Sequence, residues 1–78
     1  MYYVYFLKNT RTKRIYISYT NDLKRRFAQH SSRDKCWILV FYEAYRNEED
    51  AREREKKLKN YGNALGHLKN RIKRSTML

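Results

Sequence analysis

The chain has 78 residues, which suits a single small domain spanning residues 1–78 and leaves no room for two. Hydrophobic residues make up 41% of it, too many for a disordered tail. The 19 Lys and Arg against 8 Asp and Glu give a formal net charge of +11. That charge disfavours a neutral small-molecule enzyme and predicts a polyanionic partner: DNA, RNA or an anionic membrane face.

The first two predicted elements form a hairpin. Residues 2–7 and 13–19 are rich in aromatic and β-branched side chains, and the polar residues 9–12 between them suit a turn. Because side chains alternate along a strand, Tyr5 and Tyr16 are expected on one face of the sheet. The predicted register pairs Tyr3 with Ser18, Tyr5 with Tyr16, and Leu7 with Arg14.

A helix is predicted next, over about Asp22–Ser31, after the helix-start residues Thr20 and Asn21. On this helix Arg26 and His30 are four residues apart and therefore lie close together. The following run, Trp37–Tyr45, is apolar on both faces over its first part. It predicts a third strand that is central or well covered.

Two more helices follow. Asn47 and three acids predict the start of a helix that runs to about Asn60, where Gly62 would break the helical pattern. An apolar stripe then predicts a third helix over about Ala64–Arg74. The order is β-β-α-β-α-α, a small α+β domain.

The single cysteine, Cys36, has no partner for an internal disulfide, and two histidines are too few for a zinc cluster. The longest strongly apolar run, Cys36–Tyr42, is far shorter than the ~20 residues that cross a bilayer. No signal peptide is recognisable at the start of the sequence. These features predict a cytoplasmic domain that does not enter a membrane.

Glu55 is the sharpest functional candidate. Ala51, Glu55 and Leu58 are spaced i, i+4, i+7, so an acid lies in the stripe that should face the sheet. One interpretation is a functional carboxylate; the other is an acid at the edge of the stripe, paired with a basic neighbour.

The other candidates have structural alternatives too. Arg26 could be a solvated or phosphate-contacting arginine, and His30 a partly buried residue at a helix end. Tyr5 and Tyr16 could simply pack against each other. The exposed basic residues predict a solvated face that also binds nucleic acid: Lys24, Arg25, Lys56, Lys59, Lys69 and Arg71.

Several motifs occur together in a recognisable order. Tyr3-Val4-Tyr5 is followed after about ten residues by Tyr16-Ile17-Ser18, then by TNDLKRRFAQH, and later by WILVFYEAYRNEEDAREREKKLK. This arrangement resembles the GIY-YIG nuclease family, in particular its small single-domain bacterial members of the excinuclease-C-like type. The resemblance covers about Tyr2–Arg74.

The resemblance implies a three-stranded antiparallel sheet flanked by helices, and hydrolysis of DNA phosphodiester bonds with one Mg²⁺ or Mn²⁺ ion. No organic cofactor is implied, and the oligomeric state is not indicated. By position, the family's catalytic residues fall on Tyr5, Tyr16, Arg26 and His30, and its metal-binding glutamate falls on Glu55.

Two positions depart from the family pattern. Tyr3 and Ser18 stand where glycine is usual, and glycine at Ser18 would let backbone and substrate approach closely. The serine either obstructs that approach, which we expect, or donates a hydrogen bond to a phosphate. The alternative function is therefore a weak or inactive nucleic-acid-binding module with the same fold; a basic RNA-associated or interaction protein is a third interpretation.

Overall fold

The computed structural model describes residues 1–60 and 62–77. Its elements are, in chain order, β1 Tyr2–Asn9, β2 Ile15–Thr20, α1 Leu23–Arg33, β3 Trp37–Tyr45, α2 Glu48–Asn60, α3 Gly62–Arg71 and α4 Lys73–Thr76. This confirms the α+β class and the order of the predicted elements. The predicted bounds of the third strand and the predicted end of the second helix are also confirmed.

The three strands form one antiparallel sheet in the order β2-β1-β3, so β1 is the central strand. Val4 through Leu7 are at most 3% exposed on this strand. Residues 37–45 were expected to form a strand that is central or well covered, and the central position is wrong because β3 lies at an edge. Its apolar residues are instead explained by cover on both faces, since α1, α2 and α4 all contact β3.

The hairpin register differs from the predicted one by two residues: Tyr5 pairs with Ser18, and Leu7 with Tyr16. The turn is centred one residue later because Asn9 still belongs to β1, and the Asn9 carbonyl accepts from the Lys13 amide at 2.8 Å. Lys13 adopts the left-handed conformation that this turn needs, with φ 64°. An even shift leaves every side chain on its expected face, so Tyr5 and Tyr16 remain neighbours.

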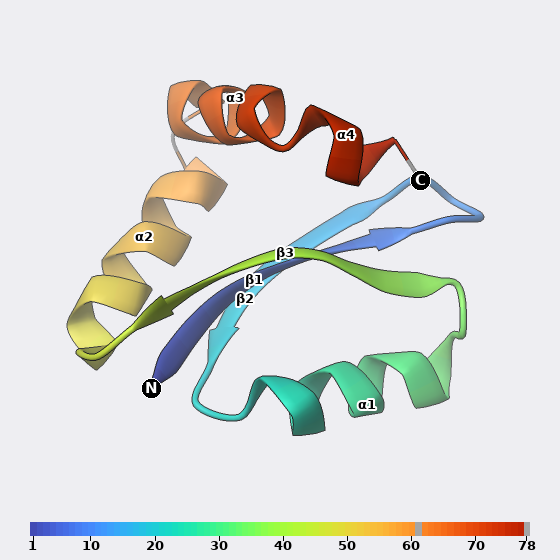
Figure 1. Cartoon of the computed structure of the whole chain (residues 1–78), viewed down its shortest axis with the longest axis horizontal. Coiled ribbons are helices and arrows are strands. Elements are labelled where there is room, and N and C mark those ends of the chain that lie inside the picture. The colour runs from blue at the N-terminus through green and yellow to red at the C-terminus, as the bar shows by residue number, and fades with distance from the viewer. Residues whose placement is uncertain (61, 78) are drawn as a thin grey trace.

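The two faces of the sheet have different roles. Figure 1 shows α2 and α3 on one side and α1 on the other. The side of α2 and α3 carries the apolar core: Val4, Phe6, Ile17, Ala51, Leu58 and Leu68. Because neighbouring strand residues point to opposite faces, Tyr5 and Leu7 are directed toward α1.

The helix ends differ slightly from the predicted ones. Asp22 caps α1 by accepting a hydrogen bond from the Arg25 amide at 3.1 Å, and α1 continues to Arg33, beyond the predicted end. The third predicted helix is divided near Ile72 into α3 and the short α4. The Lys8 ammonium donates to the Thr76 carbonyl and holds α4 over the end of β1. None of the described helices has the length and apolarity needed to cross a membrane.

Candidate active site

Three aromatic side chains from three elements meet on the α1 side of the sheet. Tyr5 of β1 and Tyr16 of β2 have ring centroids 6.2 Å apart, and the His30 ring of α1 lies 6.0 Å from Tyr5 and 4.7 Å from Tyr16. The Tyr5 hydroxyl and His30 Nε2 are 3.3 Å apart, within hydrogen-bonding distance. Two residues of the predicted motifs and one from the helix between strands are therefore in contact.

Arg26 belongs to this cluster because it lies one helical turn before His30 on the same face of α1. Its guanidinium lies close to the Tyr5 hydroxyl, and hydrogen bonding with Tyr5 raises the pKa of Arg26. A second contact orients the guanidinium, since Nη1 donates to Gln29 Oε1 at 3.2 Å. A positive charge therefore lies beside the phenols of Tyr5 and Tyr16.

The surroundings set the protonation of Tyr5 and His30. Burial raises the pKa of Tyr5, although Arg26 and Ser18 oppose this by hydrogen bonding. Burial also lowers the pKa of His30, and the positive charges of Arg26 and Arg33 lower it further. At neutral pH the cluster therefore holds a protonated Tyr5 phenol against a neutral imidazole.

The cluster opens into a hollow of about 300 Å³. Its lining residues are Tyr16, Arg26, Gln29, His30, Arg33 and Trp37. The four from α1 follow the i, i+3, i+4, i+7 spacing of a single helical face. The sequence analysis did not single out Gln29, Arg33 or Trp37 as site residues. The helical spacing could have added Gln29 and Arg33, whereas Trp37 reaches the hollow through the pairing of β3 with β1.

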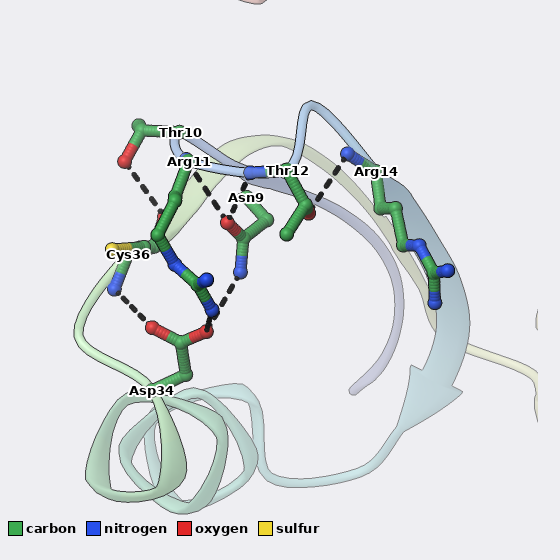
Figure 2. Close-up of polar contacts among 7 residues, drawn as sticks. All are labelled: Asn9, Thr10, Arg11, Thr12, Arg14, Asp34 and Cys36. Carbon is green, nitrogen blue, oxygen red and sulfur yellow. Dashed lines mark hydrogen bonds and ion pairs between the residues drawn. The ribbon is translucent and has the colours of Figure 1, made fainter.

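A buried polar clamp holds the end of α1 against the hairpin turn (Figure 2). Asn9, which is 2% exposed, accepts from the amides of Arg11 and Thr12 at 3.0 and 2.9 Å, and its Nδ2 donates to Asp34 Oδ2 at 2.9 Å. Asp34 follows α1 directly, and its other oxygen accepts from the Cys36 amide at 2.9 Å.

This clamp affects the candidate site because it holds the turn of α1 that carries His30. The Asp34 amide donates to the His30 carbonyl at 3.1 Å, so the clamp fixes the last turn of α1. The hydrogen bond from the Cys36 amide and that from Asn9 lower the pKa of Asp34, which keeps it ionised as an acceptor. The pair of Asn9 and Asp34 was not predicted from the sequence, because its residues are 25 apart and meet only in the folded chain.

Glu55 lies on α2, on the other side of the sheet from α1 (Figure 1). Its side chain is 19% exposed, and Oε2 is 3.5 Å from the ammonium of the half-exposed Lys59. The ion pair expected if Glu55 is an edge acid is therefore present. Among the contacts of the described residues, none joins Glu55 to Tyr5, Tyr16 or His30.

Glu55 is nevertheless near the same edge of the sheet as Tyr16. Tyr16 lies on the edge strand β2, and besides the first hollow it lines a second one, of about 330 Å³. Lys59, the partner of Glu55, lines that second hollow with Tyr16. Tyr16 therefore stands between the α1 cluster and the region beside Glu55.

The orientation of α2, and with it the direction of Glu55, is fixed by an ion pair with β3. Arg54 donates through Nε and Nη2 to the two oxygens of Glu43, at 2.8 and 3.2 Å. The Tyr45 hydroxyl also donates to Glu43, at 2.7 Å; burial and this contact raise the pKa of Tyr45 to about 12. A two-point contact of this kind restricts rotation of the helix.

The described residues suit a metal site with a single protein carboxylate, in which water and substrate supply the other ligands. The described part of the chain has no group of three or more His, Cys, Asp or Glu residues that could hold an ion. A pre-formed cage is therefore absent from residues 1–60 and 62–77. A single carboxylate such as Glu55 fits Mg²⁺ or Mn²⁺, since Mg²⁺ is often held by one or two carboxylates together with water and substrate phosphates.

The six basic residues predicted to bind nucleic acid are exposed but do not share one face. Lys24 and Arg25 lie on α1, and the other four lie on α2 and α3, across the sheet. Of these, Lys59 and Lys69 line the second hollow with Tyr16, which places them nearest the candidate site. Lys56 and Arg71 line neither of the two hollows at Tyr16.

Ser18, the departure from the family's glycine, lies directly opposite Tyr5 in the sheet. Its hydroxyl is close enough to lower the pKa of Tyr5 by hydrogen bonding.

Comparison with known proteins identifies the family of this chain. The family model described as the GIY-YIG catalytic domain matches residues 1–73. No match was found among curated proteins or among solved structures. A match over this much of the sequence leads to one conclusion: the chain belongs to the GIY-YIG catalytic domain family.

Proposed function

We propose that the protein is a divalent-metal-dependent DNA endonuclease of loose or structure-directed specificity. The observation that carries the proposal is the convergence of Tyr5, Tyr16, Arg26 and His30 on one side of the sheet. The motif order also supports a place among the small excinuclease-C-like members of the family. The net charge of +11 favours a polyanionic substrate.

The residues have separable roles. Arg26 is held by Gln29 and offers fixed donors to a phosphate, whose charge grows in the transition state. Tyr16 is only partly buried and lines both hollows, so it is the phenol that a substrate phosphate or an attacking water can reach. In its phenolate form it is our candidate for the group that accepts the proton of that water.

Tyr5 has a different position. It is 0% exposed, and its hydroxyl is in contact with His30. A phenol sealed from solvent cannot contact an attacking water directly. We therefore assign Tyr5 and His30 to holding the hydrogen-bond network beneath Tyr16 and Arg26, with the neutral imidazole as the exchangeable partner of the Tyr5 proton.

Glu55 is the candidate metal ligand. When bound, the metal ion would neutralise charge on the phosphate and on the leaving oxygen. Glu55 approaches from α2 around the β2 edge, and its pair with the exposed Lys59 is weak enough to be exchanged.

The test is a plasmid-nicking assay with Mg²⁺ or Mn²⁺, with and without a chelator, on the parent protein and two matched variants. Glu55→Gln should reduce nicking roughly a hundredfold or more, because it removes the carboxylate and keeps the shape. Glu53→Gln, on an exposed position of the same helix, should nick like the parent.

Two results would contradict the proposal. If Glu55→Gln nicks like the parent while its circular dichroism is unchanged, Glu55 is a structural acid. If the folded parent binds DNA but never nicks it with either metal, the protein is the inactive binding module.

A further inference from the structure

Trp37 forms one wall of the hollow beside the tyrosines. It is the first residue of β3, and its indole lies edge-on to Tyr16 and to His30, with ring centroids 6.3 and 6.4 Å away and interplanar angles of 64°. The indole is only partly buried, and it lies outside the apolar core between the sheet and α2. Part of an aromatic surface is thus exposed next to the candidate catalytic phenol.

The rest of the hollow suits a flat, polar ring. At about 300 Å³ its volume lies at the lower end of sites for small organic ligands, which span roughly 300–1,000 Å³. Arg33 and Gln29 are exposed on its rim, and they offer a planar cation and an amide with both donor and acceptor atoms. Within its described lining there is no carboxylate to repel a nucleotide.

We propose that this hollow binds an unpaired nucleobase, stacked on Trp37, while the adjoining phosphate lies at Arg26 and Tyr16. This rests on the proposed function, because it specifies which DNA the same site accepts. Stacking on an aromatic side chain requires a base whose face is free, and a base inside an intact duplex has none. The preferred substrates are therefore single strands, flaps and duplexes with an unpaired nucleotide.

Trp37 is the single tryptophan of the chain and so reports on its own surroundings. The experiment measures the intrinsic fluorescence of the unmodified protein, excited where tyrosine does not absorb. The protein is titrated in the presence of a chelator, at low salt, with four DNAs of equal length. These are a single strand, a matched duplex, a duplex with one unpaired nucleotide, and a strand of abasic deoxyribose phosphate. We expect strong quenching by the single strand and by the duplex with the unpaired nucleotide. We expect little quenching by the matched duplex or the abasic strand at saturation.

A set of variants tests the same site by affinity, measured by anisotropy of labelled single strand. Trp37→Leu should weaken binding about tenfold, since it removes the stacking surface and keeps an apolar side chain. Trp37→Phe should retain most of the affinity. Tyr42→Leu is the matched control: Tyr42 is a 50% exposed aromatic on the same strand, outside the hollow, and its loss should leave affinity unchanged.

The outcomes separate this proposal from the proposed function. Equal quenching by the abasic strand or the matched duplex, or equal weakening by Trp37→Leu and Tyr42→Leu, overturns the stacking site even if the protein nicks DNA. Base-dependent quenching without any metal-dependent nicking supports the stacking site and refutes the endonuclease. If Trp37→Leu fails to fold, the titrations of the unmodified protein still decide the question.

Discussion

Asn9→Ala should destabilise the protein more than any other single change in the hairpin turn. The substitution removes two acceptor contacts to the amides of Arg11 and Thr12 and the donor contact to Asp34, all between 2.9 and 3.0 Å. A typical hydrogen bond contributes about 1 kcal/mol net, so the loss is about 3 kcal/mol. Asn9 is 2% exposed, and water cannot easily replace its side chain.

The measurement is urea unfolding monitored by circular dichroism, with Thr10→Ala as the matched control. The Thr10 hydroxyl donates to the Cys36 carbonyl at 3.2 Å from an exposed position, so its loss should cost about 0.5 kcal/mol or less. At about 4–8 °C per kcal/mol in a domain of this size, Asn9→Ala should also lower Tm by roughly 12–24 °C. Equal free-energy losses for the two variants would refute the assignment of Asn9 as the residue that joins the turn to the end of α1.

Two further outcomes follow from the charges. Because burial, Arg26 and Arg33 lower the pKa of His30, nicking should persist to a pH below the ordinary histidine value of about 6.5 and be lost as the imidazole gains its proton. Arg33→Gln should move this loss of activity to higher pH, because it removes a positive charge near His30, whereas Arg25→Gln should not move it. The pH–rate profiles of both variants check this expectation, and an unchanged profile of Arg33→Gln would contradict it. DNA affinity should fall steeply with salt, with a slope of about −4 to −5 in log K against log salt if about five phosphates are contacted. A flat dependence in anisotropy titrations would show that the net charge of +11 is not what binds DNA.

Local signals in the sequence were sufficient for most of the fold. The acids after Asn47 fix the start of α2, and the apolar run from Trp37 to Tyr45 matches β3 residue for residue. The same run could not reveal that β3 is an edge strand. A strand that is covered on both faces has the same apolar pattern whether it pairs with one neighbouring strand or with two. Only the strand order of the folded sheet shows that β3 pairs with β1 alone.

The alternation of side chains along a strand explains why the candidate site was partly predictable although the predicted register was wrong. Tyr5 and Tyr16 stay on one face after a shift of two residues, and Arg26 and His30 stay together at any position of the helix end. Trp37 and Asp34 had no such local signal, because their places depend on how the loop after α1 returns to the sheet. The clamp of Asn9 and Asp34 sets that return.

The placement of Glu55 shows how a thin domain can keep its core apart from the proposed site. In a sheet of three strands, one face is needed for apolar packing, and here α2 and α3 occupy it through Leu58 and Leu68. The proposed site then lies on the α1 face and at the exposed edge at β2. A carboxylate on α2 can reach that site only around the edge of the sheet. The spacing Ala51-Glu55-Leu58 places Glu55 beside the buried stripe, where its side chain is 19% exposed and paired with an exposed lysine. The edge position of Glu55 suits an ordinary surface acid. It is therefore also the position from which a residue on the core side of the sheet could reach the proposed site on the other face.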